Sequence, residues 1–425
     1  MTEQTNPAPQ NPQLFVNNIK FNDDTEMPLD RNSIVVFTGA NNSGKSQVLK
    51  DIEQRIRNPN VSSVVIKSLQ WTRSGNIDNE FLISRLMDSG DGTNYSIRHN
   101  RMIVQNTTGW WINQWNNEKL EYIATLFIGR LDTKHRLMVS ESKQLCDPSL
   151  QNERSSLDIV YNDSEKENFI SKYFFDAFRI GLAINRRVGP RVALHIGNPP
   201  DRSTHSMCYE DTFYKEIAQF PRLDEQGDGM RSFASVLLDT FTSDYSITLI
   251  DEPEAFLHPP QARLLGKILT KHNPNERQLF ISTHSEDFLQ GLLDAESDNV
   301  TIIRINRQDS INHISTLNSE NIKRLCRTPL LRYSNILSGL FHERVIVCEG
   351  DSDCLFYQAI MNSLYESRRE IAPDILFTQC GGKGRIKDVV SALKAVNVPV
   401  SAVCDFDILN DSSKFKEIIA AFGEN

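Results

Sequence analysis

One loop constrains the fold of this chain more than any other feature. The run GANNSGKS at residues 39–46 follows the apolar stretch Ile34–Phe37 and precedes a helix-like segment from Gln47 to Ile56. Glycines in such a loop let backbone N–H groups curve around phosphate oxygens, and the following helix adds the positive end of its dipole. A GxxxxGK[ST] loop between a strand and a helix is the context that phosphate binding requires. The sequence therefore predicts a P-loop nucleotide site in an α/β fold.

Two side chains of this loop have distinct predicted roles. Lys45 should neutralise the β- and γ-phosphates of ATP, and the Ser46 hydroxyl should ligate Mg²⁺. The predicted cofactors of the site are therefore ATP and Mg²⁺. The ATP-binding residues expected in this segment are Gly39, Asn41, Asn42, Ser43, Gly44, Lys45, Ser46 and Gln47.

A second apolar stretch, Ile247–Ile250, ends in two acidic residues. A strand in this place would deliver Asp251 to the Mg²⁺ beside the phosphates. Glu252 would then orient and polarise the attacking water, because a general base has to lie within hydrogen-bond reach of that water. We expect Asp251 as a metal ligand and Glu252 as a catalytic residue.

The run DEPEAFLHP at 251–259 resembles the Walker B segment of the ABC-type ATPases of the OLD (overcoming lysogenization defect) family. About thirty residues later, STHS at 282–285 resembles the switch-histidine motif of the same proteins. This resemblance implies that His284 contacts the γ-phosphate and belongs to the catalytic set.

The run GDGMRS at 227–232 resembles the ABC signature, a helix N-terminus that closes on the ATP of a partner subunit. It departs from the transporter form, because Gly227 stands where a serine is usual and Met230 where a glutamine is usual, whereas Gly229 and Arg231 fit. Gly229 and Arg231 are therefore predicted to bind ATP in trans, which implies a homodimer or a higher homo-oligomer. Gln70, after the strand-like stretch 62–69, is a candidate Q-loop residue.

The C-terminal part carries carboxylates after apolar strands. The stretch 345–348 leads to Glu349, a GGKG turn follows at 381–384, and the stretch 398–404 leads to Asp405 and Asp407. Carboxylates on adjacent strand ends can hold one or two divalent ions that orient a scissile phosphate.

The pattern resembles a Toprim domain, the metal-dependent module of topoisomerases, primases and OLD nucleases. The resemblance assigns Mg²⁺ or Mn²⁺ and the catalytic residues Glu349, Asp405 and Asp407. The expected metal ligands of this module are Glu349, Asp353, Asp405 and Asp407.

The expected organisation is an ABC-type P-loop ATPase domain over 14–335, interrupted by an α+β insertion at about 75–225, and a small α/β Toprim-like domain over 340–425. Residues 1–13 are polar and rich in Pro and Asn, which indicates a disordered tail. Within the insertion, 122–128 and 135–139 are predicted to form a hairpin, and apolar side chains at helical spacing predict a helix over 165–180.

Composition limits the protein classes that fit. No apolar run approaches the ~18 residues that cross a bilayer, and the seven cysteines form no CxxC pair, so we expect a cytoplasmic protein with reduced thiols and no membrane partner. The net charge of −9 means that DNA contact would need a local basic patch, such as Lys383–Lys387.

The resemblance implies an ATP-regulated, Mg²⁺-dependent DNA endonuclease of the OLD type, with DNA as substrate and a role in antiviral defence. The alternative is an ATP-dependent sensor or scaffold whose non-cutting Toprim module controls a protein or nucleoprotein partner. Toprim nucleases of this family carry further residues downstream of the DxD pair, whereas this sequence stops at Asn425. We therefore expect the nuclease half to be incomplete or naturally short.

Overall fold

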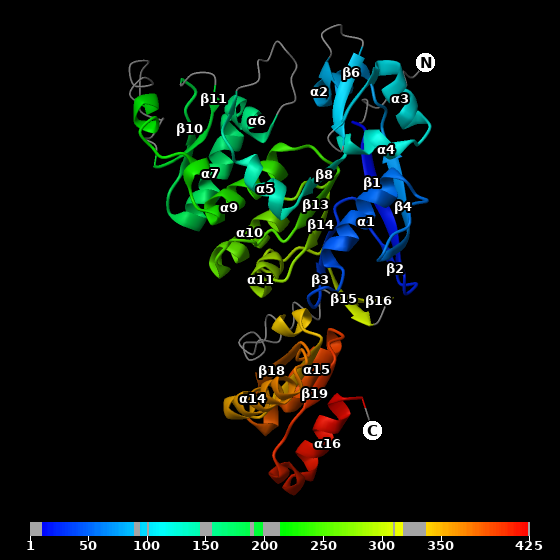
Figure 1. Ribbon diagram of the computed structural model, residues 1–425, viewed down its shortest axis with the longest axis vertical. Helices are drawn as coiled ribbons and strands as arrows, with labels where there is room; N and C mark the ends of the chain where they lie inside the picture. Colours follow the sequence, from blue (N-terminus) through cyan, green and yellow to red (C-terminus); the bar gives the residue numbers. More distant parts are fainter. Residues whose placement is uncertain are drawn as a thin grey trace, which may run out of the picture.

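The chain folds into a large upper part and a smaller C-terminal part (Figure 1). The computed structural model describes residues 11–88, 94–99, 102–144, 155–187, 191–198, 213–308, 311–317 and 337–423. Most of the tail predicted over 1–13 lies outside the described residues, and the first strand, β1, already begins at Gln13.

A six-stranded sheet forms the centre of the large part. Neighbouring strands run parallel, except that β15 and β16 pair antiparallel at one edge. The order across the sheet is β16 (Ile311–Leu317), β15 (Val300–Gln308), β3 (Ile34–Thr38), β14 (Gln278–Ser282), β13 (Ile247–Asp251) and β8 (Ile128–Leu131). The apolar runs 34–37 and 247–250 form β3 and β13, and β14 lies between these two strands. Their carboxyl ends therefore meet at one edge of the sheet, where α/β proteins place their ligands.

The two faces of this sheet are covered differently. Ile34 and Val36 of β3 contribute to a core shared with a group of helices, whereas Val35 and Phe37 contribute to a second core. That second core also contains helix α1 (Lys45–Arg57) and an antiparallel sheet. The helices of the first face are α6 (Ser156–Asn162), α7 (Ser164–Phe178), α9 (Asp228–Thr242), α10 (Pro259–Lys271) and α11 (Glu286–Asp294). The strands of the antiparallel sheet are β2 (Glu26–Pro28), β1 (Gln13–Phe21) and β4 (Ile66–Ser74).

The segment 75–225 does not form one separate body. It begins with α2 (Asn79–Arg85) and a small sheet, then returns to the central sheet as β8, and continues into the helical group. The small sheet consists of β5 (Met87–Asp88), β6 (Asn94–His99) and β7 (Met102–Thr107). The remaining elements are α3 (Thr108–Asn116), α4 (Leu120–Ile123), α5 (Thr133–Val139), the strand pair β9 (Lys143–Gln144) with β11 (Arg191–Val192), and the strand pair β10 (Leu182–Ile184) with β12 (Leu194–Ile196).

The predicted hairpin at 122–128 and 135–139 is wrong, whereas the helix predicted over 165–180 is confirmed as α7. Ile128–Leu131 pairs with β13 instead of folding back on the next segment, because its apolar side chains are buried by the parallel sheet. Asp132 then caps α5 by accepting hydrogen bonds from the backbone N–H groups of Lys134 and His135. A capping aspartate after a short strand favours the start of a helix, and the hairpin prediction did not take this cap into account.

The C-terminal part is a small α/β unit, as predicted. Its parallel strands follow the order β18 (Ile375–Gln379), β17 (Arg344–Cys348) and β19 (Val400–Ala402). Its helices are α14 (Asp351–Arg368), α15 (Ile386–Ala395) and α16 (Ser412–Ala421). The predicted strand 398–404 is thus shorter than expected. Across the described ranges, none of the helices combines the length and the apolar character needed to span a membrane.

One buried arginine joins the two parts. Arg304, in the middle of β15, is only 2% exposed. Its guanidinium group donates hydrogen bonds to the carbonyl oxygens of His342 at 2.7 Å and Asn397 at 3.3 Å. Because Arg304 lies opposite Thr38, the last residue of β3, this joint is attached next to the P-loop.

Candidate functional site

The loop after β3 has the backbone that its glycines predict. Gly39 and Gly44 have φ angles of +143° and +104°, and Asn42 adopts +60°. A Cβ atom on Gly39 would lie 2.2 Å from the carbonyl oxygen of Ile305 in β15, so no larger residue fits there. The loop therefore packs closely against β15, and this contact fixes the backbone of the loop that would bind phosphates.

Asn312 of β16 supports the same loop, a contact that no sequence motif predicted. Its side chain is 2% exposed and donates to the carbonyl oxygen of Ser43 at 2.5 Å. It also lies close to Gly44, where an added Cβ would come within 3.1 Å of the Asn312 amide nitrogen. An isolated asparagine far from the motif carries no sequence signal, so only the fold identifies it.

Lys45 lies inside the loop. Its ammonium group donates to the carbonyl oxygens of Gly39 and Ala40, both at 2.8 Å, and the residue is 7% exposed. Burial lowers the pKa of Lys45, and the nearby charges of Glu252 and Glu254 oppose that shift. The backbone of the P-loop holds this buried ammonium group, and an ammonium group is the charged donor that suits the β- and γ-phosphates of a nucleotide.

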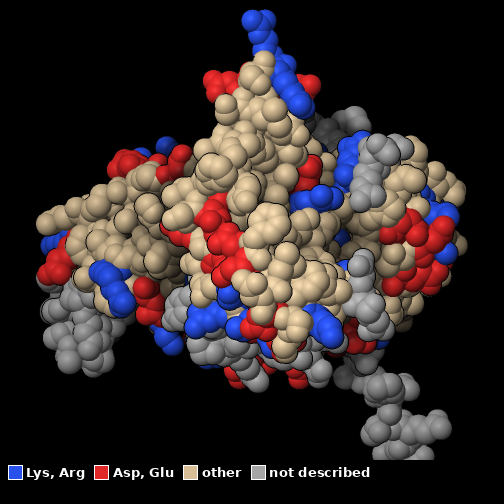
Figure 2. Space-filling model, turned by 90° about the horizontal axis from the view of Figure 1, so that it is seen from below, with Lys and Arg blue, Asp and Glu red and all other residues tan. Residues whose placement is uncertain are grey.

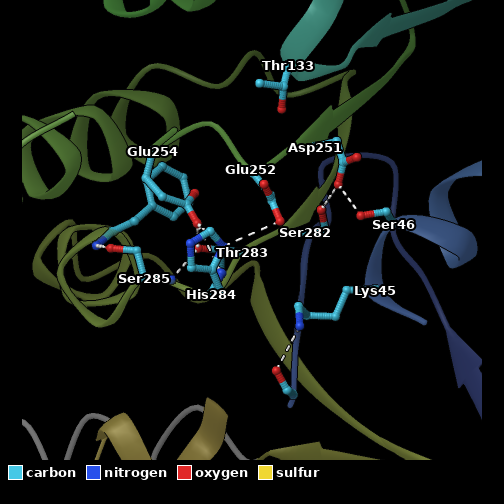
Figure 3. A network of polar contacts seen from close by, with 12 residues as sticks. Lys45, Ser46, Thr133, Asp251, Glu252, Glu254, Ser282, Thr283, His284 and Ser285 are labelled. Carbon is cyan, nitrogen blue, oxygen red and sulfur yellow. Dashed lines mark hydrogen bonds and ion pairs between the residues drawn. The ribbon is translucent and has the colours of Figure 1, made fainter. Parts of the chain in front are cut away.

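Asp251 connects the ends of three segments (Figure 3). Its Oδ1 accepts a hydrogen bond from the hydroxyl of Ser46 at 2.7 Å and another from Ser282. Ser46 is the second residue of α1, Asp251 ends β13 and Ser282 ends β14. The two predicted Mg²⁺ ligands are thus in direct contact, and a hydroxyl and a carboxylate oxygen are the ligand types that Mg²⁺ prefers.

Glu252 and His284 also meet, as Figure 3 shows. The Nδ1 atom of His284 lies 3.4 Å from Glu252 Oε1 and 3.4 Å from Glu254 Oε1. The hydrogen bond to Glu252 raises the pKa of His284, and the same bond lowers the pKa of Glu252. Both side chains are partly exposed, at 51% and 37%, so they can reach a ligand.

Glu254 is a site residue to which the sequence analysis assigned no role. Its side chain is 5% exposed and accepts hydrogen bonds from the Thr283 hydroxyl at 2.8 Å and from the backbone N–H of His284 at 3.0 Å. Burial raises the pKa of Glu254. The carboxylate fixes the backbone of the histidine segment. The position of Glu254 in the run DEPEAFLHP was the only sign of this role in the sequence. The residue type did not distinguish a buried carboxylate that supports the histidine segment from an acid exposed to solvent.

The predicted signature segment begins α9, with Gly227 as N-cap. A Cβ on Gly229 would lie 2.7 Å from the carbonyl oxygen of Phe256, so the helix start packs against the loop after β13. Arg231 donates to the carbonyl oxygen of Leu137 in α5 at 3.0 Å. Among the contacts of the described residues, none joins Gly229 or Arg231 to the P-loop of the same chain. Their role in trans remains a prediction.

The candidate Q-loop residue Gln70 does not lie at a strand end. It pairs with Asn18 in the middle of β4, and its side chain is exposed on the antiparallel sheet. The strand continues to Ser74, because β1 offers a long partner that the local sequence does not reveal. The Q-loop assignment is therefore wrong.

The acidic residues of the C-terminal part are only partly assembled. Glu349 follows β17, and its Oε1 accepts a hydrogen bond from the backbone N–H of Asp405 at 3.0 Å. Asp407 forms an ion pair with Lys383 at 2.6 Å. Asp353 Oδ2 accepts from the backbone N–H of Gly350 at 3.0 Å and so caps α14. Over the described ranges, no three His, Cys, Asp or Glu side chains are grouped so that they could hold a metal ion.

The face seen from the C-terminal end carries both signs of charge (Figure 2). Asp and Glu side chains gather near its middle, and Lys and Arg side chains are scattered around them. In the coloured part of this view, no continuous basic surface is seen. The predicted basic patch is also partly neutralised, because Lys383 is paired with Asp407 and Lys387 with Glu417.

Two family models match the chain in the order of its two parts. The model described as "AAA domain, putative AbiEii toxin, Type IV TA system" matches residues 34–289, more than half of the chain. The model described as "Overcoming lysogenization defect protein-like, TOPRIM domain" matches residues 340–407. The chain belongs to this AAA family and, with its Toprim segment, to the OLD family of ATPase–Toprim proteins. Membership implies the use of a nucleotide and of a divalent metal.

Several curated proteins are similar to this OLD-family chain. The OLD nuclease of Thermus scotoductus is 28% identical over 204 residues, 44% of this chain and 36% of that protein. The endonuclease GajA of Bacillus cereus is 26% identical over 36% of this chain and 27% of its own length. The Old nuclease of Escherichia phage P2 is 26% identical over 39% of this chain and 28% of its own length. The matches thus span about a third of the relatives' length, or less.

Solved structures of SMC heads also resemble the fold. An SMC head bound to the C-winged helix domain of ScpA is 13% identical and covers 73% of this chain and 99% of its own, with a TM-score of 0.41. The SMC head domain from Thermotoga maritima is 10% identical and covers 73% of this chain and 100% of its own, with a TM-score of 0.35.

Proposed function

We propose that this OLD-family chain binds and hydrolyses ATP as a dimer and controls a metal-dependent DNA endonuclease activity in its Toprim part, in antiviral defence. The observation that supports it best is the meeting of Lys45, Ser46, Asp251, Glu252 and His284 at one edge of the central sheet. Three relatives are named as nucleases, and these names support the second activity.

In this proposal each residue of the ATP site has one task. Lys45 neutralises the β- and γ-phosphates, and Ser46 and Asp251 hold Mg²⁺, whose charge would stabilise the transferring phosphoryl group. Glu252 orients the attacking water, and His284 contacts the γ-phosphate beside it. Gly229 and Arg231 complete the site of the partner subunit, so ATP favours the closed dimer and hydrolysis removes that preference.

Glu349, Asp405 and Asp407 are proposed as the divalent metal ligands of the Toprim part, with Mg²⁺ or Mn²⁺. A cation would relieve the repulsion of carboxylates that converge on one place. Asp407 would first have to leave Lys383, with which it is paired at 2.6 Å. We therefore expect the chain on its own to cut DNA weakly, and a longer form or a partner complex to cut in a way that depends on Asp405.

Incubation with supercoiled plasmid and Mg²⁺ or Mn²⁺, with and without ATP, tests this proposal. The matched variants are Asp405→Ala and Asp388→Ala, which removes an exposed acid at the start of α15 in the same unit. Metal-dependent nicking that is lost only in Asp405→Ala would support the nuclease. Nicking that survives Asp405→Ala would place the active site elsewhere. ATP hydrolysis without cutting by any form would favour the alternative, a sensor or scaffold that controls a partner.

A further inference from the structure

Arg136 is a fully buried charge next to the ATP site. It belongs to α5, directly after β8, and its side chain is 0% exposed. Its Nη1 donates to the carbonyl oxygen of Glu252 at 2.8 Å, and its Nη2 donates to that of Asp251 at 2.9 Å and to the Thr133 hydroxyl at 3.2 Å. Burying a guanidinium is costly unless its donors are satisfied, so its main partners indicate what it stabilises.

These partners belong to the two residues that carry the chemistry. Glu252 has a φ angle of +48°, in the left-handed region that a residue with a side chain rarely adopts. Its backbone N–H donates to the carbonyl oxygen of Ser282 at 2.9 Å, and its own carbonyl oxygen also accepts from the N–H of Ala255 at 3.0 Å. A backbone in this region persists only where its surroundings hold it, and Arg136 supplies the side-chain part of that hold.

The charge of Arg136 also suits this place. Asp251, Glu252 and Glu254 all act electrostatically on the guanidinium group. The hydrogen bond to His284 is the largest cause of the lowered pKa of Glu252, and the charges of Lys45 and Arg136 act in the same direction. A single buried cation therefore fixes the geometry of the strand end beside these carboxylates.

The element that carries Arg136 is itself held in place. The next residue, Leu137, accepts a hydrogen bond from Arg231 of α9 through its carbonyl oxygen at 3.0 Å. The helix α5 is thus fixed between the segment after β13 and the start of α9.

We propose that Arg136 is a positioning residue for ATP hydrolysis, which holds the backbone of Asp251 and Glu252 so that the Glu252 carboxylate meets the attacking water. This inference rests on the proposed ATPase function. Arg136 does not need to touch the nucleotide, so its loss should slow turnover far more than it weakens binding.

Arg136→Lys is the first test, because lysine keeps the charge but cannot bridge two carbonyl oxygens with a planar fork. We expect kcat for ATP to fall by roughly 30-fold, because small displacements of a catalytic group are costly, while nucleotide affinity changes by less than about threefold. Arg277→Lys is the matched control. Arg277 is also buried, at 5% exposed, and donates to the carbonyl oxygens of Thr240, Ser243 and Tyr245, away from the P-loop.

The control separates positioning from simple stabilisation. Arg277→Lys should lower the melting temperature but change kcat by less than about twofold, because the molecules that remain folded keep an intact ATP site. If Arg136→Lys does not fold, Thr133→Val removes the hydroxyl that orients the guanidinium and should lower kcat by roughly threefold at unchanged affinity.

The outcomes distinguish this inference from the proposed function. A wild-type chain that does not hydrolyse ATP would overturn the ATPase itself. A wild-type chain that hydrolyses ATP, with kcat unchanged in both Arg136→Lys and Thr133→Val, would overturn the positioning role alone. Equal losses of kcat and affinity in Arg136→Lys would also overturn it, because they would indicate a general distortion of the site.

Discussion

The ATP site and the acidic site of the Toprim part are built from the same kind of residue but are held differently. In the ATP site, Asp251 is bound by side chains from two other elements, and Glu254 is buried beneath the histidine segment. In the Toprim part, Asp405 and Asp407 are exposed, and Asp407 is paired with a lysine. The first site is preorganised by the fold, whereas the second has to rearrange before it can hold a metal. Preorganisation of this kind is what electrostatic catalysis requires.

Glu252→Gln should have the largest effect. The amide keeps the shape of the side chain but cannot act as a base, so we expect ATP turnover to fall by roughly 1,000-fold while binding is retained. Phosphate release measures turnover, and light scattering with ATP should show a longer-lived closed assembly. The exposed Glu276→Gln serves as control. Turnover at the normal rate in Glu252→Gln would mean that another residue is the base.

Lys45→Ala should follow in size. Loss of a buried cation that makes charge-assisted bonds to phosphate should weaken ATP binding by roughly 100-fold. Titration with a fluorescent ATP analogue measures this, and Lys50→Ala, on the exposed side of α1, is the control. Wild-type affinity in Lys45→Ala would refute the assignment of the phosphate site. The comparison with the acidic site of the Toprim part would then lose its preorganised ATP site.

The sequence predicted the local structure correctly where a motif consists of residues that are close together in the chain. The P-loop, the end of β13 and the segment STHS each depend on residues that are neighbours in the chain, so their pattern predicted the local structure correctly, and the roles assigned to them stay predictions. Asn312 and Arg136 act on these motifs from distant segments, through hydrogen bonds to backbone carbonyl oxygens, one from Asn312 and two from Arg136. Such contacts depend on the identity of one residue and on the packing of the whole sheet, and one sequence does not display them.

The errors have the same cause. Residues 122–128 and 135–139 were predicted to pair with each other as a hairpin, whereas the parallel partner of β8 lies more than a hundred residues away in β13. Gln70 was placed at a strand end because its partner strand β1 could not be recognised from local composition. In both places long-range pairing overrides the local pattern.

Asp405→Ala should have an intermediate effect, confined to the Toprim part. Loss of one carboxylate ligand should weaken Mn²⁺ binding by roughly tenfold and leave ATP hydrolysis unchanged. Lys383→Ala should act in the opposite direction and strengthen Mn²⁺ binding several-fold, because it frees Asp407 and removes a positive charge. Calorimetric titration with Mn²⁺ measures both. Equal binding in all three proteins would mean that the metal is held elsewhere.

Asp353→Asn should have the smallest effect. The sequence assigned Asp353 to the metal, but its Oδ2 accepts the backbone N–H of Gly350 and caps α14. Asp353 is the third residue of α14, where the oxygen of an asparagine amide can still accept the Gly350 N–H, and loss of one charge near a helix N-terminus costs less than about 1 kcal/mol, so the variant should unfold at nearly the wild-type temperature. If capping is the main role, Mn²⁺ affinity should also stay within about twofold, since loss of a more distant charge is screened by solvent. Asp405→Ala measured in parallel shows the size of a true ligand effect. A loss in Asp353→Asn as large as in Asp405→Ala would restore Asp353 as a ligand and show that the acidic site is more completely assembled than its contacts indicate.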